Sequence, residues 1–253
     1  MDEMLTIHFA PVGATDFSPN GELLGINNPV LNSEGVSHAD AVANLLKNTV
    51  LEAVFSGPLK RQLVTARRVA KPHSLPIRTE KNLMDVNYGS WSGRTWVEIR
   101  AEETNLIMKL EKSPHRFRFP SGEKTKKSWK RLQNFTQYLL GNFGVGHVVV
   151  VADDFVIMML VSLITGVDFI GLEPWKPSNG GMSVIDCDQG KCQLSVLRGT
   201  KVLNSSPMQR ADYSRFTSRM ISAVTSATSA PASFRALIFP SAVPAPLEMI
   251  APA

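Results

Sequence analysis

The chain has 253 residues, a mass of 27.7 kDa and a net charge of +5, and these values exclude several classes of protein. A hydrophobic content of 43% with 19% charged residues is typical of a globular protein rather than a disordered one. Two cysteines are too few for a disulfide scaffold or a cysteine-rich zinc module. The charge excess is mild, so composition does not indicate a nucleic-acid-binding protein.

The N-terminus and the longest apolar run both argue against export and membrane insertion. Residues 1–4 are acidic, whereas a signal peptide begins with positive charge. The apolar run 148–165 is long enough to span a bilayer, but it contains Asp153 and Asp154. Each would cost about 2.5–3.5 kcal/mol at the bilayer centre. We therefore expect a soluble, cytoplasmic protein with free thiols and no membrane partner.

The first half of the chain alternates between strand-like and helix-like segments. An apolar run predicts a buried strand at its start, and a loop rich in Gly, Pro and Asn follows. Apolar positions at helical spacing then predict two helices, the second opened by Pro58 at a position where proline is tolerated. The predicted strands are 5–10, 51–55 and 75–79, and the predicted helices are 35–47 and 59–70.

The second half continues the alternation. Helical segments are predicted over about 95–112, followed by a helix with an apolar stripe that includes Trp129, Leu132 and Phe135. Further along, the pattern predicts a buried strand, a buried helix and a hairpin. Such alternation with continuous apolar strands indicates an α/β fold, a three-layer αβα sandwich with a mostly parallel central sheet. The predicted later elements are the strand 148–151, the helix 155–164 and a hairpin of 182–186 with 193–197.

The composition changes near residue 204. The last fifty residues are rich in Ser, Ala and Pro and contain few acidic residues. We therefore divide the chain into a domain over residues 1–203 and a C-terminal tail over residues 204–253. The tail is expected to be partly disordered or to act as an oligomerisation arm.

Five short motifs occur in an order and at intervals that resemble the histidine phosphatase superfamily, also called phosphoglycerate mutase-like. The resemblance covers roughly residues 4–200 and implies the phosphoglycerate mutase-like fold. Each motif is weak alone, but their order makes the resemblance strong. The motifs are Pro11–Thr15 with the glycines at 21, 25 and 35, Ser56–Arg61 with Thr65 and Ala66, Leu83–Gly93, Phe119–Glu123 and Val148–Ile157.

The resemblance also implies a catalytic set, and most of it is missing. In this family a histidine attacks phosphorus, two arginines and a second histidine hold the phosphoryl oxygens, and a carboxylic acid protonates the leaving group. Residue by residue, the nucleophile's position is Val12 and the adjacent arginine's is Pro11. The second histidine is replaced by Asp153, and Asp85 stands where glutamate is usual. Arg61 alone keeps its identity, so the phosphohistidine route is closed.

The five histidines of the chain are not expected to replace the missing nucleophile. His8 lies four residues before Val12, roughly 13 Å back along the strand at about 3.3 Å per residue. The remaining histidines fall on a helix, in loops or just before a strand, and Cys187 and Cys192 flank a hairpin turn. We interpret all of these side chains as structural; the other histidines are His38, His73, His115 and His147.

The charge balance of the predicted pocket opposes phosphate. Arg61 faces Asp85, Asp153 and the adjacent Asp154, so the pocket is net negative if all of them ionise. A phosphate dianion about 4 Å from one uncompensated negative charge is repelled by roughly 8 kcal/mol at an effective dielectric of about 20. We expect Arg61 to form a bidentate pair with one aspartate, and Asp154 to be the N-cap of the helix near residue 155. The pocket then suits a cation, a neutral polar ligand or no ligand.

Three functions remain open. The first is a pseudophosphatase that acts as a binding or scaffolding module. The second is a repurposed enzyme that uses Asp85 and Asp153, with Asp154, as general acid and base or to bind a hard cation, while Arg61 orients a small-molecule substrate. The third is an active phosphatase or phosphoglycerate mutase.

Partners follow less directly from the sequence. We expect no resident cofactor or metal, and a small molecule or a protein as partner. Members of this family are often dimers, so the resemblance allows a homodimer without fixing the oligomeric state. The basic clusters at 109–118 and 124–131 indicate a solvated face; the alternative is an acidic partner or an anionic surface. Nucleic acid is not expected, because neither cluster contains a known binding motif.

Overall fold

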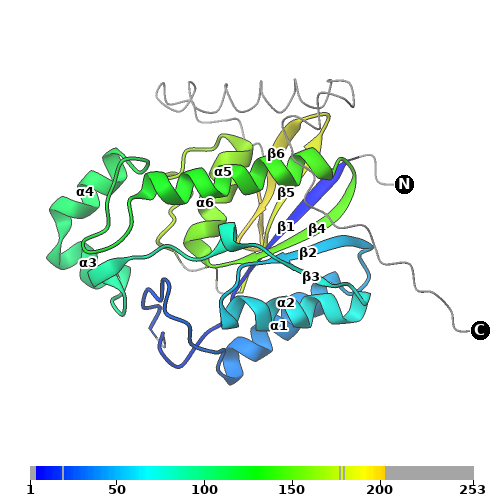
Figure 1. Ribbon diagram of the computed structural model, residues 1–253, viewed down its shortest axis with the longest axis horizontal. Coiled ribbons are helices and arrows are strands. Elements are labelled where there is room, and N and C mark those ends of the chain that lie inside the picture. Colours follow the sequence, from blue (N-terminus) through cyan, green and yellow to red (C-terminus); the bar gives the residue numbers. More distant parts are fainter. Residues whose placement is uncertain (1–3, 19, 177, 179, 203–253) are drawn as a thin grey trace, which may run out of the picture.

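The structure is a computed structural model that describes residues 4–18, 20–176, 178 and 180–202. Its centre is a seven-stranded sheet in the order β3-β2-β4-β1-β5-β6-β7 (Figure 1). β5 and β7 run against the direction that the other five strands share, so the sheet is mixed and mostly parallel, as predicted. The strands are β1 (Leu5–Pro11), β2 (Leu51–Ser56), β3 (Ile77–Thr79), β4 (Gly146–Ala152), β5 (Ser183–Asp188), β6 (Lys191–Leu197) and β7 (Thr200–Lys201).

Helices cover both faces of this sheet. The helices α1 (Ser33–Leu46) and α2 (Lys60–Ala70) lie on one face, and α5 (Thr125–Asn142) and α6 (Asp154–Thr165) lie on the other (Figure 1). Because successive strand residues point to opposite faces, the central strands feed two separate cores. The three-layer αβα sandwich predicted from the sequence is confirmed. Ala10, Val149 and Val151 belong to the core under α1 and α2, whereas Ile7, Phe9, Val148 and Val150 belong to the core under α5 and α6.

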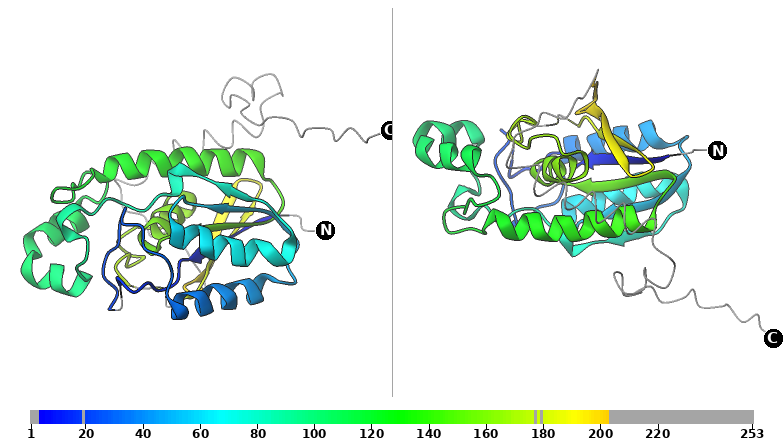
Figure 2. Two further views of the ribbon diagram at one scale, coloured as in Figure 1. Left: turned by 60° about the horizontal axis from the view of Figure 1, so that its bottom comes forward. Right: turned by 90° about the horizontal axis from the view of Figure 1, so that it is seen from above.

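Two short helices extend the molecule at one end. α3 (Trp96–Glu102) and α4 (Thr104–Lys112) lie together at the end opposite the start of β1 in all three views (Figures 1 and 2). Thr95 and Glu98 form a reciprocal capping box at the start of α3. The chain passes from β3 to this end through the 3-10 turns η2 (Lys81–Leu83) and η3 (Gly89–Trp91), whereas the 3-10 turn η1 (Lys71–His73) connects α2 to β3.

The apolar run 148–165 divides at its two aspartates into the end of β4 and the helix α6. All residues of α6 from Phe155 to Ile164 are buried, which explains why the helix is apolar on every side. None of the helices in the described part of the chain is long and apolar enough to cross a membrane.

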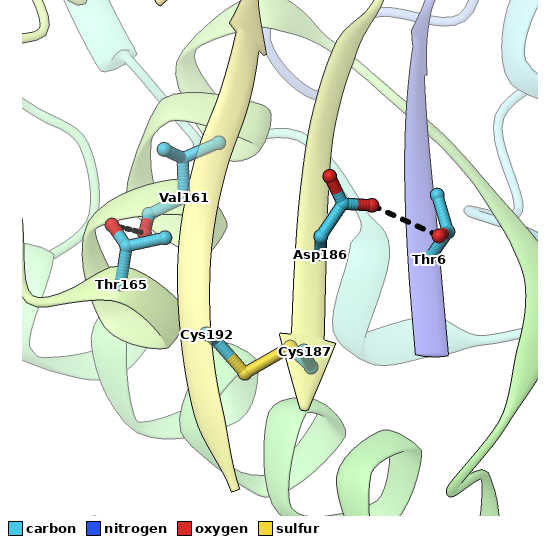
Figure 3. The surroundings of a disulfide bond; sticks show 6 residues. All are labelled: Thr6, Val161, Thr165, Asp186, Cys187 and Cys192. Atoms are coloured by element: carbon cyan, nitrogen blue, oxygen red, sulfur yellow. Dashed lines mark hydrogen bonds between the residues drawn. A yellow bond between two sulfur atoms is a disulfide. The ribbon is translucent and has the colours of Figure 1, made fainter. Parts of the chain in front are cut away.

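The predicted hairpin is present, but the expectation of free thiols is wrong. β5 and β6 are joined by the two-residue turn Gln189–Gly190, in which both residues have positive φ. This turn places Cys187 directly opposite Cys192, and the two form a disulfide (Figure 3). On the other side of β5, Asp186 accepts a hydrogen bond of 2.9 Å from Thr6 of β1 (Figure 3). The predicted C-terminal tail, residues 204–253, lies outside the described residues.

Candidate functional site

The carboxyl ends of β1, β2 and β4 meet at one edge of the sheet, where open α/β sheets bind their ligands. At this edge Pro11, the last residue of β1, pairs with Ala152, the last residue of β4. Val12 therefore follows β1 at the point where Asp153 follows β4. Arg61 enters from the first turn of α2, which follows β2. The structure thus brings together three of the positions that the sequence motifs singled out.

A close backbone contact fixes the path of the chain after β1. A side chain at Gly13 would place its Cβ 2.3 Å from the carbonyl oxygen of Gly35, and one at Gly35 would lie 2.1 Å from that of Ala14. Only glycine allows this approach. Asn32 caps α1 by accepting a hydrogen bond from the Gly35 amide at 2.8 Å. The loop after β1 is therefore held against the start of α1.

Arg61 is fully buried and every donor atom of its guanidinium is engaged. Its Nε donates to Oδ1 of Asp153 at 2.6 Å, and its Nη1 donates to the carbonyl of Asn27 at 2.6 Å. Its Nη2 donates to the carbonyl of Gly25 at 2.7 Å and to Oδ2 of Asp85 at 3.2 Å. The predicted bidentate pair with one aspartate is wrong in detail, because loop carbonyls occupy the outer nitrogens and each aspartate makes one contact.

Asp153 uses its second oxygen on a residue that the sequence motifs did not single out. Its Oδ2 accepts from Nε2 of Gln62 at 2.8 Å, and that nitrogen also donates to the carbonyl of Leu83 at 3.0 Å. Gln62 is fully buried, and its Oε1 accepts from the Leu59 amide. No sequence signal distinguishes Gln62 from other polar residues of the helix. We call Arg61, Gln62, Asp85 and Asp153 the strand-end cluster.

Asp154 is not the N-cap of α6, contrary to expectation. Asp153 occupies the cap position, although its side chain points to Arg61 and does not cap the helix. Asp154 is the first helical residue, and its Oδ2 accepts from the amide of Ser178 at 3.1 Å. Its Oδ1 is buried and has no hydrogen-bond partner among the described residues.

Burial changes the charge balance expected for this site. It raises the pKa of Asp85 to about 8, an effect that the nearby Asp153 carboxylate reinforces and Arg61 only partly offsets. Burial also raises the pKa of Asp154. For Arg61, burial alone would lower the pKa, but the two aspartates outweigh it and the pKa is raised. Asp85 is therefore largely protonated at neutral pH, and the site is less negative than the formal count of its aspartates predicts.

The two residues at the end of β1 that the sequence motifs singled out carry no reactive side chain. Pro11 is buried at the end of β1, and Val12 is half-buried and packs against the core under α1 and α2. Neither can attack phosphorus or bind a phosphoryl oxygen through its side chain.

The histidines lie elsewhere, as predicted. The Nε2 of His8 lies 3.1 Å from Nδ1 of His147 in the middle of the sheet, a pair that only the strand register reveals. His38 on α1 lies 3.8 Å from Glu34, and the ring of His115 packs on that of Trp129. Among the described residues, the hydrogen bonds of Arg61 include none to an imidazole.

The part of the chain that the structure describes contains no group of three or more His, Cys, Asp or Glu side chains arranged to hold a metal ion. Asp85 and Asp153 are turned towards Arg61 instead, so the geometry does not present the hard-cation site considered from the sequence.

Comparison with known proteins gives a consistent picture. The family model "Histidine phosphatase superfamily (branch 1)" matches residues 12–200. Phosphoserine phosphatase 1 from Hydrogenobacter thermophilus is 25% identical over 175 residues, which cover 69% of this chain and 83% of the relative.

Two solved structures illustrate the likeness of fold. The alpha-ribazole phosphatase from Shigella flexneri has a TM-score of 0.63 at 21% identity, covering 79% of this chain and 100% of that one. Mycobacterial glucosyl-3-phosphoglycerate phosphatase has a TM-score of 0.66 at 19% identity, covering 77% and 99%. At these identities the likeness concerns the fold alone.

Proposed function

The chain belongs to the histidine phosphatase superfamily (branch 1), and from this we propose that it is a catalytically degenerate member. It acts as a pseudophosphatase, a binding or scaffolding module for a small molecule or a protein, and does not turn over phosphate esters. The proposal concerns the residues at the strand ends, because the fold itself is that of the family.

The observation that carries the proposal is the state of Arg61. This is the one phosphate-holding residue whose identity the chain keeps, and its side chain is fully buried. Its three nitrogens donate to two aspartates and two loop carbonyls. A phosphoryl group would have to displace Asp153 or Asp85 to reach it, and would then meet the displaced carboxylate.

The nucleophile position supports the same conclusion. A phosphohistidine enzyme needs an imidazole at the end of the first strand, where this chain has Val12. Pro11 removes the neighbouring cation, and Asp153 places a carboxylate where a second imidazole would bind the phosphoryl group. Three changes at one site abolish attack, binding and charge complementarity together.

The test is an assay of phosphate release and of phosphoenzyme. We expect the purified chain to hydrolyse phosphoserine and p-nitrophenyl phosphate no faster than buffer, and to form no acid-labile phosphoenzyme with labelled substrate. Phosphoserine is included because the relative from Hydrogenobacter thermophilus carries that name. Turnover that copurifies with the chain would overturn the proposal and favour an active phosphatase.

A repaired variant controls for the scaffold. Pro11→Arg/Val12→His/Asp153→His restores the family residues and removes the main partner of Arg61, so labelled phosphoenzyme is expected. The matched control Pro11→Arg/Val12→Gln/Asp153→His carries the same other changes without a nucleophile and is expected to form none. Equal labelling of the two variants would show that the label does not report attack at position 12.

A second candidate function rests on Asp85. A buried carboxyl whose pKa is raised to about 8 can donate a proton at neutral pH, as a general acid does. In that case the chain is a repurposed enzyme in which Asp85 acts with Asp153 on a small molecule. A metabolite screen by thermal shift, followed by turnover assays of each hit in the parent and in Asp85→Asn, separates this candidate from a pure binding module.

A further inference from the structure

The positive charge of this protein is concentrated in one segment. Residues 109–131 contain nine Lys or Arg against two Glu, whereas the rest of the chain contains eighteen Lys or Arg against twenty Asp or Glu. The net charge of +5 therefore comes from these twenty-three residues, and the remainder is slightly negative. We call the segment 109–131 the basic segment.

Most of its cations are exposed and form no ion pair within the described part of the chain. Its two acids are already engaged, since Glu111 accepts from Arg100 at 2.8 Å and Glu123 lies 3.7 Å from Arg131. The other eight cations form no salt bridge with any described residue. These exposed side chains are Lys109, Lys112, Arg116, Arg118, Lys124, Lys126, Lys127 and Lys130.

The local structure crowds these cations instead of separating them. Arg118 and Lys124 are partners in an isolated antiparallel β-bridge, so two cations stand side by side. Lys124 is the N-cap of α5 without a capping side-chain bond, and Lys126 and Lys127 follow in a first turn that has no acid. The N-terminus of a helix carries partial positive charge and favours acidic residues, so these lysines reduce the stability of the fold. A ligand that neutralises them would remove this cost.

The basic segment lies at an accessible end of the molecule. It runs from the end of α4 through the connection to the first turns of α5, at the same end as α3 and α4 (Figures 1 and 2). The α5 part also borders the strand-end cluster, because Arg131 donates to the carbonyls of Asn82 and Asp85. Arg131 thus links α5 to the strand-end cluster, to which the eight exposed cations do not belong.

The composition of the surface indicates what kind of anion it fits. Six of the eight cations are lysines, which act as point charges, whereas arginine is preferred for bidentate recognition of individual phosphates or carboxylates. The aromatic residues Phe117, Phe119 and Trp129 are buried, so none is available to stack on bases or to anchor a protein partner. A diffuse anionic surface needs neither feature, and clusters of four to eight Lys or Arg are typical of proteins that bind acidic lipids.

We propose that the basic segment binds peripherally to the surface of an anionic lipid bilayer. Met108 is 60% exposed and lies one helical turn before the exposed Lys112 on α4, so it adds an apolar group to this surface. The sequence-based expectation of no membrane partner rested on the lack of a spanning segment, which peripheral binding does not require. The proposal is independent of whether the chain hydrolyses phosphate esters.

Cosedimentation of the full chain with lipid vesicles tests the proposal. We expect retention by vesicles of phosphatidylcholine with about one third phosphatidylserine, no retention by phosphatidylcholine alone, and loss of binding at about 0.5 M salt. Lys124→Gln/Lys126→Gln/Lys127→Gln/Lys130→Gln is expected to weaken partitioning about tenfold or more. Its thermal midpoint should equal or exceed that of the parent, because the substitutions relieve repulsion at the start of α5.

A matched variant separates position from total charge. Lys47→Gln/Lys71→Gln/Lys81→Gln/Lys191→Gln removes the same charge from four exposed lysines outside the segment and is expected to partition within about twofold of the parent. Equal losses in the two variants would contradict the proposal, since binding would then follow net charge alone. Retention by RNA or by polyaspartate but not by the acidic vesicles would also overturn it, in favour of a different class of partner.

Discussion

Two polar clusters, one buried and one partly buried, lie on the same sheet and avoid uncompensated charge by different means. In the strand-end cluster the charge of Arg61 is compensated by the Asp153 carboxylate, and each nitrogen of its guanidinium has a hydrogen-bond partner. In the middle of the sheet, burial and the neighbouring His147 lower the pKa of His8 to about 4, so the ring is neutral. The Nδ1 of His8 has no hydrogen-bond partner among the described residues.

The difference concerns how each cluster responds to change. A paired cluster fails when one partner is removed, because the remaining charge stays buried and uncompensated. A cluster kept neutral by deprotonation tolerates loss of the side chain but fails when the pH falls. Truncation should therefore damage the first cluster most, and acid should damage the second.

Removal of Arg61 is expected to have the largest effect. In Arg61→Met the Asp153 carboxylate loses its cation while remaining buried, and we expect a loss of about 3–5 kcal/mol in the free energy of unfolding. Urea denaturation of the parent and the variant measures this difference.

Arg68→Met is the matched control on the same helix. Arg68 pairs with Asp40 at 2.6 Å, but both side chains are more than 40% exposed, so the expected loss is about 1 kcal/mol or less. If the two variants lost similar stability, the strand-end cluster would not be the tightly coupled unit described above.

Acid is expected to destabilise the protein through His8. The pKa of His8 falls from 6.5 to about 4 on folding, so the unfolded state binds the proton first as the pH drops. The contribution of neutral His8 to the free energy of unfolding is fully present above about pH 7 and is lost progressively between about pH 6.5 and 4. At pH 5 the loss is about 2 kcal/mol. In His8→Leu this contribution should disappear, and urea denaturation at about pH 8 and pH 5 measures it. A variant as acid-sensitive as the parent would assign the effect to other groups.

Much of the fold could be predicted from the sequence because its signals are local. The apolar run 148–151 and the helical spacing of 35–47 each mark their own element, and the observed bounds differ by one or two residues. The glycines at 13 and 35 fall at family spacing because the backbone approaches itself there. The disulfide was not predicted because it depends on the register of the turn at Gln189–Gly190.

The site was predictable in its members but not in its contacts. Family spacing placed Arg61, Asp85 and Asp153 together, and the structure confirms that they meet. The carbonyls of Gly25 and Asn27 were not predicted as partners, because a backbone oxygen has no sequence signature. The burial that keeps Asp85 protonated was not predicted either, because it depends on how neighbouring residues pack around the side chain.

Near pH 5 the smallest effect of a substitution is expected at Asp85, and its pH dependence has the opposite sign to that of His8. The folded state raises the pKa of Asp85 from 3.8 to about 8, so it keeps a proton that the unfolded state loses. This contribution to stability therefore falls as the pH rises from about 4 to about 8. In Asp85→Asn one of the two hydrogen bonds from Arg61 and the Val86 amide is lost, which costs about 1 kcal/mol.

The same substitution removes the ionisation, so Asp85→Asn should be less stable than the parent at about pH 5 and should approach or exceed it by about pH 8. Urea denaturation of both proteins at half-unit pH intervals measures this convergence. A difference that stays constant over the range would mean that Asp85 is ionised throughout. In that case the strand-end cluster would carry two carboxylates against one guanidinium, and the proton donor that the repurposed-enzyme candidate requires would not exist.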